Sequence, residues 1–129
     1  MSKLAYEAMK GQIIHMSPDF VKMHTKAILN KSNTAEVSYE NVLEYLSSTH
    51  LIRSLDNGSK DVKEHAYFFV HQSFQEYFAA YHIARLCFKN KAVPTDVVTY
   101  LKENRDKRYF LLTWRFTSGI LYGKQKECE

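Results

Sequence analysis

The feature that most constrains this chain is an abrupt change from strand to helix around His71. The preceding run, Tyr67–Val70, is apolar and aromatic, which is typical of a short buried strand. The following residues, Ser73–Phe74–Gln75–Glu76, match the capping box S-x-x-E, in which serine and glutamate side chains bond the first amides of a helix. We therefore expect a strand and a helix to meet at His71, where exposed amides favour an anion such as a phosphate.

The composition is that of a globular protein with one modest core, or with a small domain and part of another. Of the 129 residues, 45% are hydrophobic and 25% are charged, and the 4 glycines and 2 prolines argue against disorder. The two cysteines, Cys87 and Cys128, have no CxxC partner, so neither a zinc site nor a disulfide framework is expected. A reducing compartment is the default for such a chain.

The charge pattern argues against nucleic acid and against a membrane. The net charge of the chain is +4. Its lysines and arginines occur in small scattered clusters and do not form one basic stripe. Lys3, Glu7 and Lys10 interrupt any apolar run that could act as a signal peptide, and no window is apolar enough to span a bilayer. We expect a cytoplasmic protein.

Periodicity predicts a mostly α fold with one short β-hairpin. Helices are expected over residues 2–11, 18–30, 39–49, 73–89, from 95 to a turn at 104–108, and over 109–122. Strands are expected at 51–55 and 66–70, separated by the turn signal Asp56–Asn57–Gly58–Ser59. Three helices followed by a hairpin is the order of a winged helix, in which the hairpin is the wing.

The 73–89 helix carries apolar residues on two faces, so we expect it to be covered on both sides, as a connector between two domains is. Its aromatic stripe is interpreted as core and not as a platform for stacking bases. The stripe comprises Phe74, Tyr77, Phe78 and Tyr81.

A known family has similar motifs. The segment 69–80, FVHQSFQEYFAA, resembles the F-x-H-x-S-F-Q-E-F/Y-x-A-A signature of NACHT-type signal-transduction ATPases, which include the NOD-like receptors. Lys3–Ala8 resembles the K-L-A-x-x-A start of that family's winged helix, and Trp114–Leu121 resembles a W-x-F-x-x-G-L-L segment of the next domain. The resemblance implies that residues 1–88 are the winged-helix domain, that 89–129 open the following helical domain, and that the chain is a fragment of a longer protein.

The resemblance also implies a role for His71. In the family, the matching histidine contacts the β-phosphate of ADP and holds the receptor closed, with Ser73 and Glu76 as the helix cap beside it. The chain has no G-x-x-x-x-G-K-[ST] phosphate loop and no apolar run ending in paired acids for magnesium. We therefore expect no ATP hydrolysis by this chain alone. ADP or ATP would bind only in the full-length protein, with the nucleotide-binding domain of the same parent chain as partner.

Several alternatives stay open. His71 could satisfy backbone groups at a strand end. His65, His71 and His82 match no usual zinc spacing, so no metal site is expected. A DNA-binding winged helix is a rival, but the 39–49 helix contains Glu40 and Glu44 and no lysine or arginine. A free-standing adaptor that uses its apolar helices for a partner or for self-association is the other rival.

Overall fold

The computed structural model describes residues 1–29, 38–56, 58, 61–89 and 92–127. Within them the elements are, in chain order, α1 (Ser2–Lys10), α2 (Pro18–Leu29), α3 (Tyr39–Ser48), β1 (Ile52–Ser54), the 3-10 turn η1 (Val62–Glu64), β2 (Tyr67–Phe69), α4 (Gln72–Lys89), α5 (Thr95–Asn104), the 3-10 turn η2 (Arg108–Phe110) and α6 (Leu111–Glu127). The prediction of a mostly α fold with a short hairpin is confirmed.

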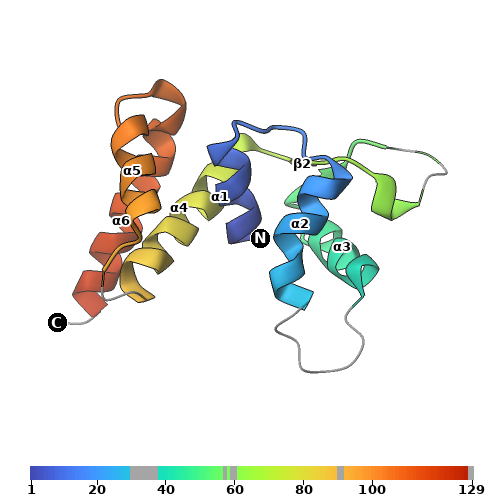
Figure 1. The fold of residues 1–129 in the computed structure, drawn as a ribbon, viewed down its shortest axis with the longest axis horizontal. Coiled ribbons are helices and arrows are strands. Elements are labelled where there is room, and N and C mark those ends of the chain that lie inside the picture. Colours follow the sequence, from blue (N-terminus) through green and yellow to red (C-terminus); the bar gives the residue numbers. More distant parts are fainter. Residues whose placement is uncertain (30–37, 57, 59–60, 90–91, 128–129) are drawn as a thin grey trace.

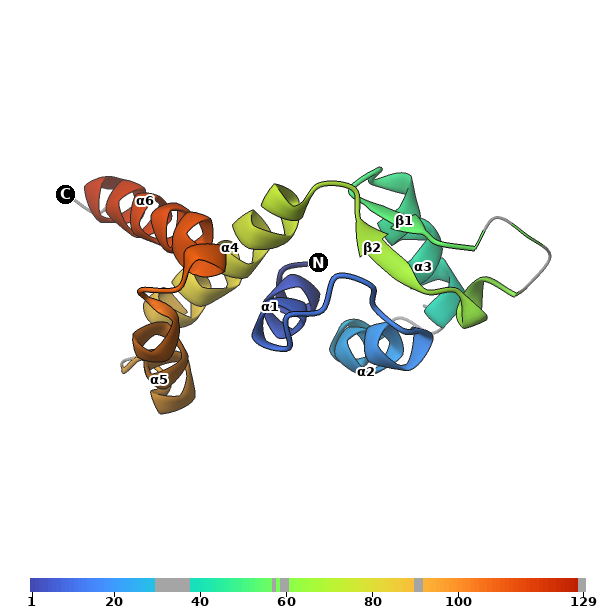
Figure 2. The ribbon, with the colours of Figure 1, turned by 90° about the horizontal axis from the view of Figure 1, so that it is seen from above.

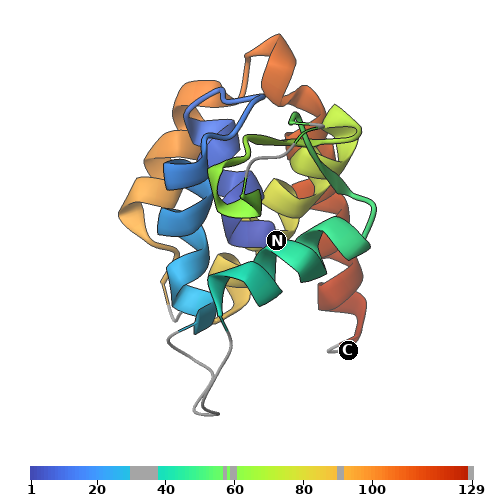
Figure 3. The same ribbon diagram turned by 90° about the vertical axis from the view of Figure 1, so that its right-hand side faces the viewer.

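The molecule is elongated, with α4 near its centre (Figure 1). At one end lie α2, α3 and the hairpin, and at the other lie α5 and α6 (Figures 1 and 2). Figure 3 looks along the molecule from the end that carries α2, α3 and the hairpin. Helix α1 lies between the two ends and packs on α4.

Serine caps fix the starts of α2 and α3. The amide of Phe20 donates to Ser17 Oγ at 3.2 Å, and the amide of Asn41 donates to Ser38 Oγ at 3.2 Å. Each bond satisfies one of the amides that a helix start leaves without an internal partner. Both predicted helix starts are therefore confirmed. The segment 31–36, between these two helices, lies outside the described residues.

The hairpin pairs β1 with β2 in antiparallel register, with Ile52 opposite Phe69 and Ser54 opposite Tyr67. The other edge of β2 is also paired, because Met16 and Tyr67 exchange backbone hydrogen bonds of 2.7 and 2.9 Å. The sequence predicts no strand between the first two helices. The pairing brings Met16 into the core, where it is fully buried, and completes the order of elements typical of a winged helix.

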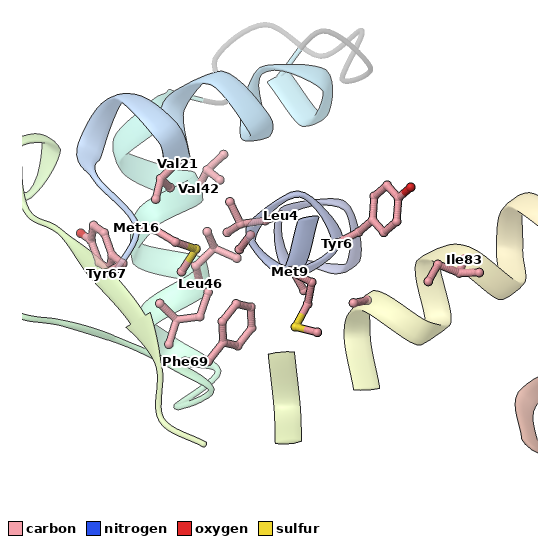
Figure 4. Close-up of a cluster of buried hydrophobic side chains, with 14 of the residues drawn as sticks. Leu4, Tyr6, Met9, Met16, Val21, Val42, Leu46, Tyr67, Phe69 and Ile83 are labelled. Atoms are coloured by element: carbon pink, nitrogen blue, oxygen red, sulfur yellow. The ribbon is translucent and has the colours of Figure 1, made fainter. Parts of the chain in front are cut away.

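One hydrophobic core runs through the hairpin half and continues onto α4. Leu4 of α1 points toward residues of α2, α3 and β2 on one side of α1, while Tyr6 and Ile83 lie on the other side (Figure 4). The labelled members of this cluster are Leu4, Tyr6, Met9, Met16, Val21, Val42, Leu46, Tyr67, Phe69 and Ile83. Helix α1 therefore joins the winged-helix elements to α4.

Small residues carry the contacts of α4 with its neighbours. Ala5 and Ala8 of α1 and Ala79 of α4 are fully buried, as are Ala80 and Ala84 on the next face of α4. The buried side chains of α6 are Thr113 and Thr117. Side chains this small let helix axes approach closely. The expectation that α4 is covered on two sides is confirmed, with α1 on one side and α6 on the other. A domain division at residues 88 and 89 stays a prediction.

Ile83 lies at the centre of α4 and is fully buried. We expect Ile83→Ala to lower the free energy of unfolding by about 2–5 kcal/mol, because it removes buried methyl groups and leaves a cavity. Urea unfolding followed by circular dichroism measures the loss. Tyr45→Ala is the control, since Tyr45 on α3 is 68% exposed, and its effect should stay within about 0.5 kcal/mol. Equal losses from both variants would contradict the central place of α4 in the core.

Candidate functional site

His71 is the single residue between the end of the hairpin pairing and the first residue of α4. The amide of Val70 still donates to Leu51 O at 2.9 Å, which extends the pairing one residue beyond β2. The amide of Phe74 donates to His71 O at 3.0 Å, which closes the first turn of the helix. His71 therefore occupies the N-cap position, where the chain passes from β2 into α4 (Figure 2).

The imidazole of His71 is exposed and makes one ring contact. Its centroid lies 5.4 Å from that of Phe74, with the rings at 70°. Among the described residues, it has no hydrogen bond and no ion pair. The alternative in which His71 satisfies backbone groups of its own strand end is therefore not observed. His71 is thus an exposed residue at the start of an 18-residue helix.

The predicted capping box is wrong. Since α4 begins at Gln72, Ser73 is the second residue of the helix and cannot be its N-cap. The backbone explains the difference. Pairing with Leu51 holds the strand through Val70, and the first turn then closes directly on the carbonyl of His71. No described residue forms a hydrogen bond with the Ser73 hydroxyl, in contrast to the hydroxyls of Ser17 and Ser38.

Glu76 is buried and is not a capping side chain. It is only 8% exposed, and burial raises the pKa of its carboxyl group. Its neighbour Gln75 has a role that the motif alone did not indicate. Gln75 Nε2 donates to Ile13 O at 3.1 Å, which ties the start of α4 to the segment between α1 and α2. Of the two polar residues, Gln75 thus forms a hydrogen bond beside the junction, and Glu76 is buried there.

Two hollows flank the start of α4. One, of about 210 Å³, is rich in side-chain amides, since Gln12, Gln72 and Gln75 line it together with Met9, Ile13, Ile14 and Tyr109. The other, of about 360 Å³, is mostly aromatic, and its lining residues are Leu51, Ser73, Phe74, Tyr77, Phe78 and Phe116. The two residues that follow His71 line different hollows. Gln72 lines the hollow that is rich in amides, and Ser73 lines the aromatic one.

The aromatic stripe of α4 is not simply core, which corrects the expectation. Tyr77 and Tyr81 remain 42% and 41% exposed, although Phe74 and Phe78 are partly buried. The ring of Tyr77 packs edge-on against Phe78 and Phe116, with centroids 5.6 and 5.4 Å apart. Because α6 turns its threonines inward, the rings of α4 lie at the rim of the contact between the helices and line a groove.

His65 and His82, the two histidines considered with His71 as metal ligands, have other neighbours. His65 is buried, with Nδ1 2.9 Å from Ser54 Oγ. His82 packs on the ring of Tyr6 at 5.0 Å, and burial, followed by the charge of Arg85, lowers its pKa. Within the described ranges, no three histidine, cysteine, aspartate or glutamate side chains come together in a way that could hold a metal ion.

No model of a known protein family matches the chain, and no curated protein matches it. The likeness to NACHT-type ATPases therefore stays a prediction that rests on three motifs. None of the helices in the described part of the chain has the length and apolar character needed to cross a bilayer.

The serines give a direct test of the observed helix starts. We expect Ser38→Ala to lower the free energy of unfolding by about 1 kcal/mol, because it removes a capping bond. Ser73→Ala should cost less than about 0.5 kcal/mol, because this exposed hydroxyl caps nothing. Urea unfolding of both variants beside the parent chain makes the comparison. If Ser73→Ala lowers the free energy of unfolding as much as Ser38→Ala does, Ser73 caps the helix after all.

The burial of Glu76 predicts a specific dependence on pH. A raised pKa means that the folded state holds the proton more tightly than the unfolded state, so the ionised carboxylate opposes folding at pH 7. We expect Glu76→Gln to raise the melting temperature at pH 7. The difference should shrink as pH falls through the raised pKa and should vanish below the ordinary value of 4.5, where both states are protonated.

Thermal unfolding at a series of pH values measures this difference. Glu44→Gln on α3 is the control, because Glu44 is exposed. If Glu76→Gln lowers the melting temperature at pH 7, burial is not the dominant influence on this carboxyl group.

Proposed function

We propose that this chain is the ADP-sensing, autoinhibitory module of a cytoplasmic NACHT-type signal-transduction ATPase and is not catalytic by itself. One observation carries the proposal. The histidine of the signature lies exposed at the junction of strand and helix, where it contacts the ring of Phe74 and has no hydrogen bond or ion pair with a described residue. A side chain fixed in this way is available to a ligand held by another part of the parent protein.

The physics of the junction suits a phosphate. An anion at this place would gain a hydrogen bond from the imidazole and the attraction of the unpaired amides at the start of α4. The neighbouring hollow offers the amides of Gln12 and Gln72 as further polar groups. The sequence provides no phosphate loop, so the nucleotide would be bound mainly by the nucleotide-binding domain of the same parent chain.

The proposed switch is a rotation of one domain against another. With ADP, His71 would bridge to the β-phosphate and keep the two domains together. A γ-phosphate would need the space that the imidazole occupies, so ATP would favour a different arrangement of the domains. The large apolar side chains exposed beside the site agree with a surface that meets another domain, since Ile14 is 64% exposed.

The surface of α3 does not favour the rival of a DNA-binding winged helix. Glu40 and Glu44 are both exposed on α3, and Glu40 forms an ion pair with Lys63 of η1. A helix that enters the major groove must approach phosphates, which these carboxylates would repel.

The parent protein tests the proposal. The coding sequence upstream of this chain should contain a phosphate-loop motif, and the whole gene product should be purified with ADP bound. We expect His71→Leu to lower the ADP content and to speed ADP release at least about tenfold, because it removes a charge-assisted hydrogen bond. Chromatography of nucleotide released by denaturation measures the content, and displacement of a fluorescent ADP analogue measures the rate.

His15→Leu is the matched control, because His15 is an exposed histidine that contacts the ring of Phe68 and not Phe74. It should leave ADP content and release unchanged. An upstream sequence without a phosphate loop, or equal ADP retention by His71→Leu and the parent protein, would refute the sensor role.

A further inference from the structure

Two hollows follow one another along the contact between α4 and α6, and we call the row that they form the groove. Its first part is the aromatic hollow lined by Phe74, Tyr77 and Phe116. A second hollow of about 240 Å³ follows, lined by Tyr81, Ala84, Arg85, Phe88, Lys89, Ile120 and Lys124. Tyr77 and Tyr81 are one helical turn apart, as are Phe116 and Ile120, so the two hollows lie in one row.

The walls of this groove are apolar and incompletely covered. Tyr77, Tyr81 and Phe88 are 42%, 41% and 49% exposed, and they follow one another along one side of α4. From Ser73 to Phe88 the groove covers about 22 Å of helix, at about 1.5 Å per residue. A row of hollows of this length between two helices has the dimensions for a helix of about four turns.

Charge distinguishes the two ends of the groove. Arg85 and Lys89 are exposed at the far end, and neither forms an ion pair with a described residue. The only carboxylates on the two helices are Glu76, which is buried, and Glu127, whose Oε2 lies 2.8 Å from Lys124 Nζ. The aromatic end of the groove has no lysine or arginine in its lining. The groove is thus apolar along its length and positive at one end.

We propose that this groove binds an amphipathic helix of a partner protein, with its apolar face on the aromatic side chains and acidic residues against Arg85 and Lys89. A single strand of nucleic acid fits less well, because it carries a charge at every nucleotide and needs cations along its whole path. A second copy of the chain would present the same positive face and would supply no free carboxylate from α4 or α6.

Two peptides of about 15 residues test the proposal. Both carry leucines one turn apart along one face and differ only in their last two turns, where the acidic peptide has glutamates and its twin has lysines. Fluorescence anisotropy of labelled peptides titrated with the 129-residue chain gives the affinities. We expect the acidic peptide to bind at least about tenfold more tightly than its twin and to lose affinity with added salt.

Variants locate the binding site. Arg85→Glu should abolish or reverse the preference for the acidic peptide, and Tyr81→Ala should weaken it by at least about tenfold. Both side chains are exposed, so folding is preserved, which circular dichroism checks. Arg115→Glu makes the same charge change on α6 without lining either hollow, and Tyr45→Ala removes an exposed tyrosine from α3. Both controls should leave the affinities unchanged.

Equal affinities for the two peptides, or no saturable binding of the acidic one, would overturn the proposal. So would an oligouridylate that competes for the groove more tightly than the acidic peptide. A chain that is dimeric in light scattering, and that Tyr81→Ala converts to monomers, would assign the groove to a second copy and overturn it as well. The peptides contain no nucleotide, so these outcomes are independent of the role of His71 in ADP binding.

Discussion

The close packing of α1 and α6 on two sides of α4 is the contact on which the rest of the structure depends. Alanines line the contact of α4 with α1, and alanines and threonines line its contact with α6. Little space therefore remains between the helices. Because a larger side chain at Ala79 or Ala80 would have to separate the helices, these positions set the distance between the two halves. One helix therefore positions the hairpin end, the C-terminal helices and the junction at His71 together.

Hydrogen bonds on both sides of His71 hold the junction between strand and helix. Backbone hydrogen bonds hold the residue before His71 to the hairpin and close the first turn of α4 directly after it. Gln75 adds a bond from the helix to the carbonyl of Ile13. The backbone at His71 is therefore ordered before a ligand binds, and only the side-chain rotamer of the imidazole remains to be fixed. Such an ordered backbone suits the sensor role that we propose for His71.

The sequence could predict the parts of this fold that depend on local chemistry. Ser17 and Ser38 precede apolar periodic segments, and both cap helices as the pattern indicates. Ser73 fits the same pattern and does not cap, because the hairpin pairing that fixes the helix start comes from Leu51, far away in the sequence. The pairing of Met16 with Tyr67 involves one residue on each side and leaves no periodicity to detect. Spacing also showed which aromatic residues share a face of α4, but not how far α6 covers them.

The uncovered aromatic rim follows from the same small residues that hold α6 in place. Since the threonines of α6 face inward, a single helix cannot cover the rings of Tyr77, Tyr81 and Phe88 as well. Full burial of such a side chain is worth about 1.5–3 kcal/mol, so part of that stabilisation is available to a ligand in the groove. Phe74 connects the groove to the junction, because its ring contacts the imidazole of His71 and lines the aromatic hollow. A ligand that displaces Phe74 from either side changes the surface that the other ligand meets, and by thermodynamic linkage the effect on the two affinities is reciprocal.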